Sequence, residues 1–224
     1  MKKEFLDPKK HVFLWDLHEV ILKKTIWSWF ITCIRFPRKM EVIRKLDKKT
    51  IIILLTFLCE RLKLTKKQLV SEELLNAAQQ AHNDALIELT IQACSSYTPI
   101  KKTVIIIEKL SQLGYQHYLG SNIGQTVFDD CVKKFPFIFN LFSGHIIPFV
   151  SPNTGKLIKK PQPEFFYAYI QKYKKNPNHI IFIDDKPTNI QAAQLLGIQT
   201  ILFKDSSSLQ QSIAFFIPES HSTQ

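Results

Sequence analysis

Residues 180–197 read IIFIDDKPTNIQAAQLLG, and their pattern is the clearest indication of the fold in the sequence. The first four residues are all apolar and lead into a carboxylate at Asp184, as in a buried strand of a parallel sheet. Residues 189–196 favour a helix, and Gly197 follows at the place where glycine commonly ends one. A strand followed closely by a helix predicts one unit of a sheet whose strands are joined by right-handed crossovers.

The same alternation continues on both sides of this stretch. An apolar run over 11–16 ends in Asp16, and a predicted strand over 116–121 ends in Ser121. Polar residues at the carboxyl ends of parallel strands mark the edge where open α/β sheets bind ligands. We expect a three-layer, Rossmann-like α/β core with strands over 11–16, 116–121, 138–142, 180–184 and 199–203, and helices over 100–113, 127–134, 163–173 and 189–196.

Residues 24–96 differ in character from the rest of the chain. This stretch has no glycine, is rich in helix formers and repeats apolar residues at helical spacing. It predicts an all-helical insert. We therefore expect two domains, an α/β core of residues 1–23 plus 97–224 and a helical domain of residues 24–96.

Composition limits the classes of protein and of partner. The 224 residues carry a formal net charge of +11, but the lysines occur as scattered pairs without a long basic block. That distribution is typical of a solvated surface, so we expect no dedicated nucleic-acid site. No apolar run reaches the ~20 residues of a membrane span, and we recognise no secretory signal. Four widely spaced cysteines without a CxxC pair favour a reducing, cytoplasmic setting.

Three carboxylates are predicted to meet at one edge of the sheet. Asp16 ends one strand and the pair Asp184–Asp185 ends another, so neighbouring strands would bring them together. Like charges at such short range need a compensating cation. Mg²⁺ prefers oxygen ligands and suits one or two carboxylates together with a substrate phosphate. The alternative is that each strand-end aspartate only caps the helix that follows it.

Four short motifs follow one another along the chain. The strand that ends in Asp16 comes first, LGSN (residues 119–122) second, KPQPEFF (160–166) third, and a stretch of the form IDDxxxNIxAA (183–193) fourth. In type and order they resemble the motifs of the haloacid dehalogenase-like (HAD) hydrolase superfamily, over residues 11–203. The insert between the first and second motifs resembles an α-helical cap, which implies that residues 24–96 close over the site.

The resemblance implies a Mg²⁺-dependent phosphatase for a small phosphorylated metabolite, with Asp16 as the nucleophile that forms a transient aspartyl-phosphate. The other implied roles are Lys160 as the cation that offsets charge on nucleophile and phosphate, Ser121 and the backbone amide of Asn122 as phosphate ligands, and Asp16, the backbone carbonyl of His18, Asp184 and Asp185 as Mg²⁺ ligands. Three alternatives are Ser121 as a helix N-cap, Lys159 in place of Lys160, and Asp185 as a cap of the helix near Pro187.

His18 and Glu19 depart from the family pattern, in which phosphatases usually carry a second aspartate, the general acid/base, followed by glycine. Imidazole can take the acid/base role because its reference pKa of about 6.5 suits a group that protonates a leaving oxygen and then activates water. One alternative is a weakly active or inactive domain that binds phosphate and Mg²⁺ as a regulatory or binding module. Another is a different transfer reaction on the same scaffold. A side chain at position 19 also restricts a tight turn.

Overall fold

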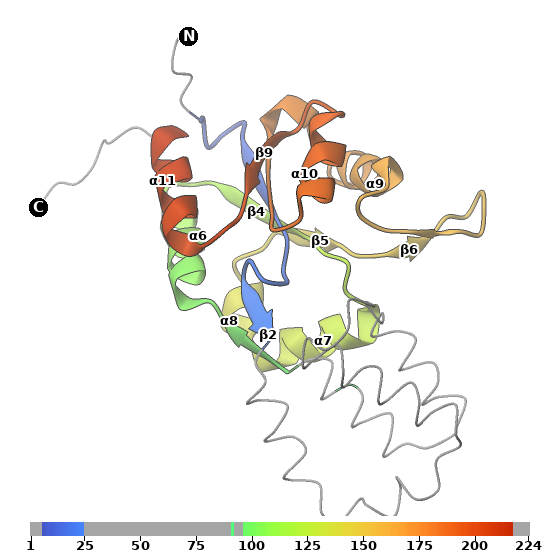
Figure 1. Ribbon diagram of the computed structural model, residues 1–224, viewed down its shortest axis with the longest axis horizontal. Helices are drawn as coiled ribbons and strands as arrows, with labels where there is room; N and C mark the ends of the chain where they lie inside the picture. Colours follow the sequence, from blue (N-terminus) through green and yellow to red (C-terminus); the bar gives the residue numbers. More distant parts are fainter. Residues whose placement is uncertain (1–5, 25–90, 92–95, 217–224) are drawn as a thin grey trace, which may run out of the picture. The chain divides into compact units, whose positions relative to one another are not determined.

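The computed structural model describes residues 6–24, 91 and 96–216, which include the segments of all four motifs (Figure 1). Contacts within the chain divide it into two compact units. The first consists of Met1–Lys23, Pro99–Asn122 and Pro136–Gln224, and the second of Lys24–Thr98 and Ile123–Phe135. The helical domain predicted at 24–96 falls almost entirely outside the described residues and stays a prediction.

A parallel sheet of five strands forms the centre of the first unit. Its order is β5-β4-β1-β8-β9, so β1 lies in the middle and the chain adds strands on both sides of it. All residues of β1 and β8 are buried, which is why both strands are nearly continuous apolar runs in the sequence. The strands are β1 (Val12–Trp15), β4 (Gln116–Gly120), β5 (Gly144–Ile146), β8 (Ile180–Asp184) and β9 (Gln199–Leu202).

Helices cover both faces of this sheet, as Figure 1 shows, and the three-layer α/β fold predicted from the sequence is confirmed. On one face, Phe166 of α9 and Ala193 of α10 join Leu14 and Phe182 of the sheet in one buried cluster. On the other face lie α6 and α11, which contact each other. The helices are α6 (Lys101–Gln112), α9 (Pro163–Tyr173), α10 (Pro187–Gln194) and α11 (Ser206–Phe216).

The strand predicted at 138–142 is wrong. Residues Pro136–Phe139 form the short helix α8, and the strand that pairs with β4 on the side away from β1 is β5, Gly144–Ile146. A proline at the first helical position favours a helical turn, and a short apolar run alone does not distinguish a strand from a buried helix. β5 was missed because it has only three residues. Its Gly144 is required by packing, since a Cβ there would collide with the hydroxyl of Tyr173.

The remaining elements are short, apart from one helix of the second unit. They are β2 (Leu22–Lys24) and β3 (Tyr97–Pro99), which pair as a two-stranded sheet, the antiparallel hairpin of β6 (Phe149–Val150) and β7 (Leu157–Ile158), and a 3₁₀ turn at Pro177–His179. The second unit contains α7 (Gln125–Lys134), which buries Val127, Phe128 and Cys131. No helix within the described residues is both long enough and apolar enough to cross a bilayer.

Candidate active site

Three adjacent strands end in the polar residues that the sequence singled out. Asp16 directly follows β1, Ser121 directly follows β4, and Asp184 is the last residue of β8. Backbone hydrogen bonds continue the sheet through these positions, from the Asp16 N–H to the Ile183 carbonyl (2.8 Å) and from the Ser121 N–H to the Ile146 carbonyl (3.1 Å). Because β4, β1 and β8 are parallel neighbours, their carboxyl ends meet at one edge, where open α/β sheets bind ligands.

The predicted cluster of carboxylates is present. Asp16, Asp184 and Asp185 each place an oxygen within 4.8 Å of the others. Asp16 and Asp184 are buried, and the Oδ1 atom of Asp185 is buried without a hydrogen-bond partner. Burial, with repulsion from Asp16 and Asp184, raises the pKa of Asp185 to about 6. A hard divalent cation would relieve this repulsion and give the open oxygen a partner, so these residues fit Mg²⁺.

Lys160 places its ammonium between two of these carboxylates. Its Nζ atom donates to Asp16 Oδ1 (2.8 Å) and to Asp184 Oδ2 (2.6 Å), and the residue is only 3% exposed. Burial alone would lower the pKa of Lys160, but the charges of both carboxylates and the hydrogen bonds to them raise it above its ordinary value. The group is therefore a fixed cation. Lys159, the alternative from the sequence, donates its backbone N–H to Gln162 Oε1 (2.7 Å).

Asp184 is held in place by three further hydrogen bonds, two from one asparagine amide nitrogen and one from the backbone. The Nδ2 atom of Asn189 lies 2.9 Å from both carboxylate oxygens, and the backbone N–H of Lys186 donates to Oδ1 at 2.8 Å. The Asn189 side chain thereby steadies the loop that follows β8. Helix α10 begins with Lys186 as its N-cap residue and has no side-chain cap, so Asp185 does not cap it.

Ser121 is fully buried, and its hydroxyl has no hydrogen-bond partner. The alternative that it is a helix N-cap is wrong, because α7 begins only at Gln125 and its N-cap residue is Gly124. Buried hydroxyls in native structures almost always have a partner, so one without a partner requires a reason. A bound anion that accepts from this hydroxyl would supply it.

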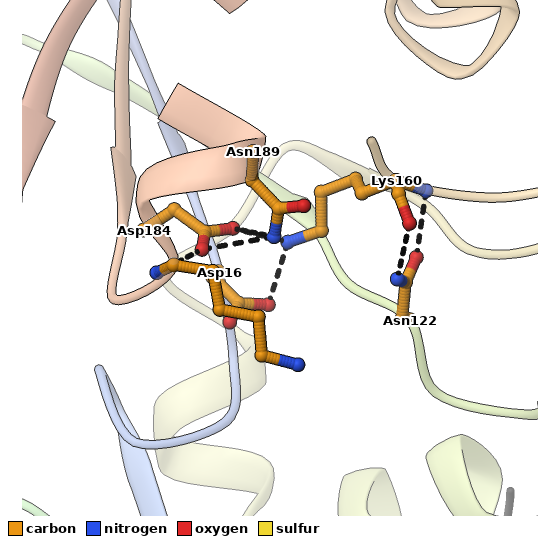
Figure 2. A network of polar contacts seen from close by, with 6 residues as sticks. Asp16, Asn122, Lys160, Asp184 and Asn189 are labelled. Atoms are coloured by element: carbon orange, nitrogen blue, oxygen red, sulfur yellow. Dashed lines mark hydrogen bonds and ion pairs between the residues drawn. The ribbon is translucent and has the colours of Figure 1, made fainter. Parts of the chain in front are cut away.

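Asn122 contributes its side chain, a role that the sequence did not indicate. Its Nδ2 atom donates to the Lys160 carbonyl (2.8 Å), and its Oδ1 atom accepts from the Lys160 N–H (2.9 Å), as Figure 2 shows. The second motif is thereby joined directly to the third. The backbone amide of Asn122, which the resemblance assigns to the phosphate, follows Ser121 at the end of β4.

His18 and Glu19 lie in the tight turn that follows Asp16. The N–H groups of Ile21 and Leu22 both donate to the Leu17 carbonyl, and the Glu19 N–H donates to the Leu22 carbonyl at 2.8 Å. Glu19 has a φ of 60°, a left-handed conformation that glycine adopts more easily than glutamate. The expected conflict between a side chain and this turn is therefore present. His18 is half-buried and forms an isolated β-bridge with Leu22.

A buried polar pair beside the site was missed by sequence reasoning. The Nε1 atom of Trp15, the residue before Asp16, donates to His117 Nδ1 at 3.1 Å. Burial lowers the pKa of His117 to about 4, so the ring is neutral at physiological pH. A histidine inside a strand that is buried from residue 117 on was the available signal, since a buried polar group requires a partner.

Comparison with known proteins places these features in a family. A family model described as haloacid dehalogenase-like hydrolase matches residues 12–197. A chloroplastic flavin mononucleotide hydrolase of Arabidopsis thaliana is 35% identical over 66 residues, and bifunctional epoxide hydrolase 2 of Rattus norvegicus is 35% identical over 49. These matches cover 30% and 22% of this chain, and they span only 26% and 9% of the two relatives.

Solved structures agree on the fold. A HAD family enzyme of Bacteroides thetaiotaomicron, in complex with magnesium and inorganic phosphate, is 22% identical with a TM-score of 0.56, over 89% of this chain and 98% of that one. A predicted HAD-like family hydrolase of Porphyromonas gingivalis is 18% identical with a TM-score of 0.56, over 92% and 98%. Because this family model spans most of its length, including all four motifs, the chain belongs to the haloacid dehalogenase-like hydrolases.

Proposed function

We propose that this protein is a Mg²⁺-dependent phosphatase for a small phosphorylated metabolite and that the reaction passes through an aspartyl-phosphate on Asp16. One observation carries the proposal. The buried Lys160 ammonium contacts Asp16 and Asp184 at the strand ends, where Ser121 has a buried hydroxyl without a partner. A nucleophile, a fixed cation and an open donor are the groups that phosphoryl transfer requires, because its catalysis is mostly positioning and charge stabilisation.

The proposed Mg²⁺ ligands are the carboxylates of Asp16, Asp184 and Asp185 and the backbone carbonyl of His18. When bound, the ion would offset the charge of the carboxylates and of the substrate phosphate. The crystal structure of the Bacteroides relative holds magnesium and inorganic phosphate, which supports the proposal that this chain also binds Mg²⁺ and a phosphate group.

Each residue of the site has a defined task in the proposed reaction. Asp16 attacks phosphorus while Ser121 donates to a phosphoryl oxygen and Lys160 offsets the negative charge. The bond from phosphorus to the leaving oxygen breaks, and His18 gives that oxygen a proton. Water then attacks the aspartyl-phosphate and gives its proton to His18, so phosphate leaves and the Asp16 carboxylate is restored.

The test measures phosphate release from a panel of phosphorylated metabolites with and without Mg²⁺. The panel includes flavin mononucleotide, because one relative hydrolyses it. We expect Mg²⁺-dependent turnover in wild type and none in Asp16→Asn. Asp129→Asn, which removes an exposed carboxylate on α7, is the matched control and retains activity. A wild type as inert as Asp16→Asn across the panel contradicts a phosphatase.

A second candidate is a binding or regulatory module with a vestigial site, and His18 is the observation that favours it. The family usually has aspartate at this position, and without a competent acid/base the site would bind phosphate and Mg²⁺ without turnover. This candidate predicts that beryllofluoride and Mg²⁺ bind together to an inactive wild type and that His18→Asp gains activity. A phosphatase that uses His18 instead loses activity in His18→Ala by about 10²–10⁴-fold.

A further inference from the structure

Asn122 is the one described side chain that hydrogen-bonds both backbone groups of Lys160 (Figure 2). It extends from the end of β4, next to Ser121, to the loop between β7 and α9 that carries Lys160. The two hydrogen bonds measure 2.8 and 2.9 Å, which is the ordinary range for strong amide bonds. The phosphate-binding motif and the lysine motif are therefore mechanically linked by one carboxamide.

The local backbone explains why Lys160 needs such a partner. The residue lies in a turn outside every helix and strand, so regular secondary structure does not satisfy its N–H and C=O groups. The neighbouring residue is fixed in a similar way, because the Lys159 N–H donates to Gln162 Oε1 and the Lys159 carbonyl accepts from the Gln162 N–H. Side chains thus supply partners for the backbone of both lysines.

Asparagine suits this position for chemical reasons. A carboxamide presents one donor and one acceptor side by side, which matches the N–H and C=O of a single residue. Aspartate has the same shape but no donor, and its charge would face the Lys160 carbonyl. Alanine offers neither group.

The position of the Lys160 backbone decides where its ammonium lies. A lysine side chain has four rotatable bonds, yet Nζ must reach Asp16 Oδ1 at 2.8 Å and Asp184 Oδ2 at 2.6 Å within a buried site. We propose that Asn122 is a positioning residue, which holds the Lys160 backbone so that the ammonium stays between the two carboxylates. Its effect on turnover rests on the proposed phosphatase function, whereas its effect on Lys160 does not.

The first experiment reads the position of Lys160 without any substrate. Reductive methylation with formaldehyde labels accessible lysines, and mass spectrometry measures the rate at each one. We expect Lys160 to be protected in wild type and to react about tenfold faster in Asn122→Ala and in Asn122→Asp, as outer partners of a site typically act. Asn178→Ala, which alters an exposed asparagine before β8, leaves the rate unchanged. Equal protection of Lys160 in all four proteins overturns the proposal.

The second experiment is a double-mutant cycle on phosphate release. We expect Asn122→Ala to lower kcat about 10- to 100-fold and to have no further effect in a Lys160→Met background. Losses that multiply in the double variant would mean that Asn122 acts on substrate and not through Lys160. A wild type without turnover would count against the phosphatase, while the labelling still decides the role of Asn122. Should Asn122→Ala not fold, Asn122→Asp carries both measurements.

Discussion

Buried polar atoms without partners occur in two regions of the first unit, and the two regions differ in charge. In the core they are His117 Nε2 and the Tyr169 hydroxyl, and burial keeps both groups neutral by lowering the pKa of His117 and raising that of Tyr169. At the strand ends they include the Ser121 hydroxyl and Asp185 Oδ1, beside a cluster of buried charges. A neutral polar group without a partner costs less free energy to bury than a charge does, so a bound ligand would bring the larger gain at the strand ends.

The largest expected effect comes from removing the Lys160 ammonium from the cluster of buried charges at the strand ends, called the charged region below. Lys160→Met leaves Asp16 and Asp184 buried without a counter-charge, so we expect turnover to fall by about 10³-fold. Without Mg²⁺ the free energy of unfolding falls by about 3–5 kcal/mol, as when one partner of a buried ion pair is removed, and Mg²⁺ restores part of it. Phosphate release and urea unfolding with and without Mg²⁺ measure both. Lys159→Met is the control, and equal losses in the two variants would contradict a special role for Lys160.

Ser121→Ala separates activity from stability. Because the hydroxyl has no partner in the protein, its removal changes the free energy of unfolding by less than about 0.5 kcal/mol. Loss of a donor to the phosphoryl group lowers kcat by about 10²–10³-fold. The matched control is Ser206→Ala, whose hydroxyl lies 2.9 Å from the Thr103 hydroxyl in the core. That variant loses about 1 kcal/mol of stability and keeps its activity. If Ser121→Ala instead lost stability and kept its activity, a role for Ser121 in phosphate binding would be contradicted.

His117, in the core region described above, predicts how the free energy of unfolding depends on pH. The pKa of His117 is about 4 in the folded protein and about 6.5 in the unfolded chain, so the unfolded chain takes up a proton first as the pH falls. The stabilising contribution is complete above pH 6.5 and is lost between 6.5 and 4, by up to about 3 kcal/mol. His117→Gln keeps an acceptor for Trp15 and does not titrate. Urea unfolding at pH 7.5, 5.5 and 4.5 should therefore show a free energy of unfolding that depends less on pH in that variant than in wild type. An equal dependence in the two proteins would contradict the lowered pKa of His117.

The sequence predicted those parts of the fold that depend on long, regular patterns. The apolar runs of β1 and β8 and the helix Pro163–Tyr173 are confirmed, because full burial of a strand and a proline at a helix start leave clear local signals. The strand placed at 138–142 was wrong because a five-residue apolar run carries no period that separates strand from helix. β5, β6 and β7 have only two or three residues and leave no pattern at all.

The candidate site was predictable to a different extent. The resemblance to the family implied Lys160, with Lys159 as the alternative, and the structure places the Lys160 ammonium against the carboxylates. The side-chain contact of Asn122 with Lys160 was not predictable, because it joins residues 38 positions apart through a loop without regular structure. The Trp15–His117 pair likewise depends on the register of β1 with β4, which a single sequence does not give.

The smallest expected effect concerns strain beside the charged region. Glu19 and Lys174 are the two described non-glycine residues with positive φ, at 60° and 50°. Replacing either with glycine relieves a left-handed conformation that costs about 1 kcal/mol, offset in part by the greater freedom of glycine in the unfolded chain. We expect both Glu19→Gly and Lys174→Gly to raise the free energy of unfolding by a few tenths of a kcal/mol.

The two variants should differ in turnover. Lys174 is the C-cap residue of α9, so its substitution leaves turnover unchanged. Glu19 lies next to His18, and a looser turn there changes kcat, which shows whether the strain holds the proposed acid/base in place. Equal kinetics in the two variants would mean that the conformation of Glu19 serves the fold alone.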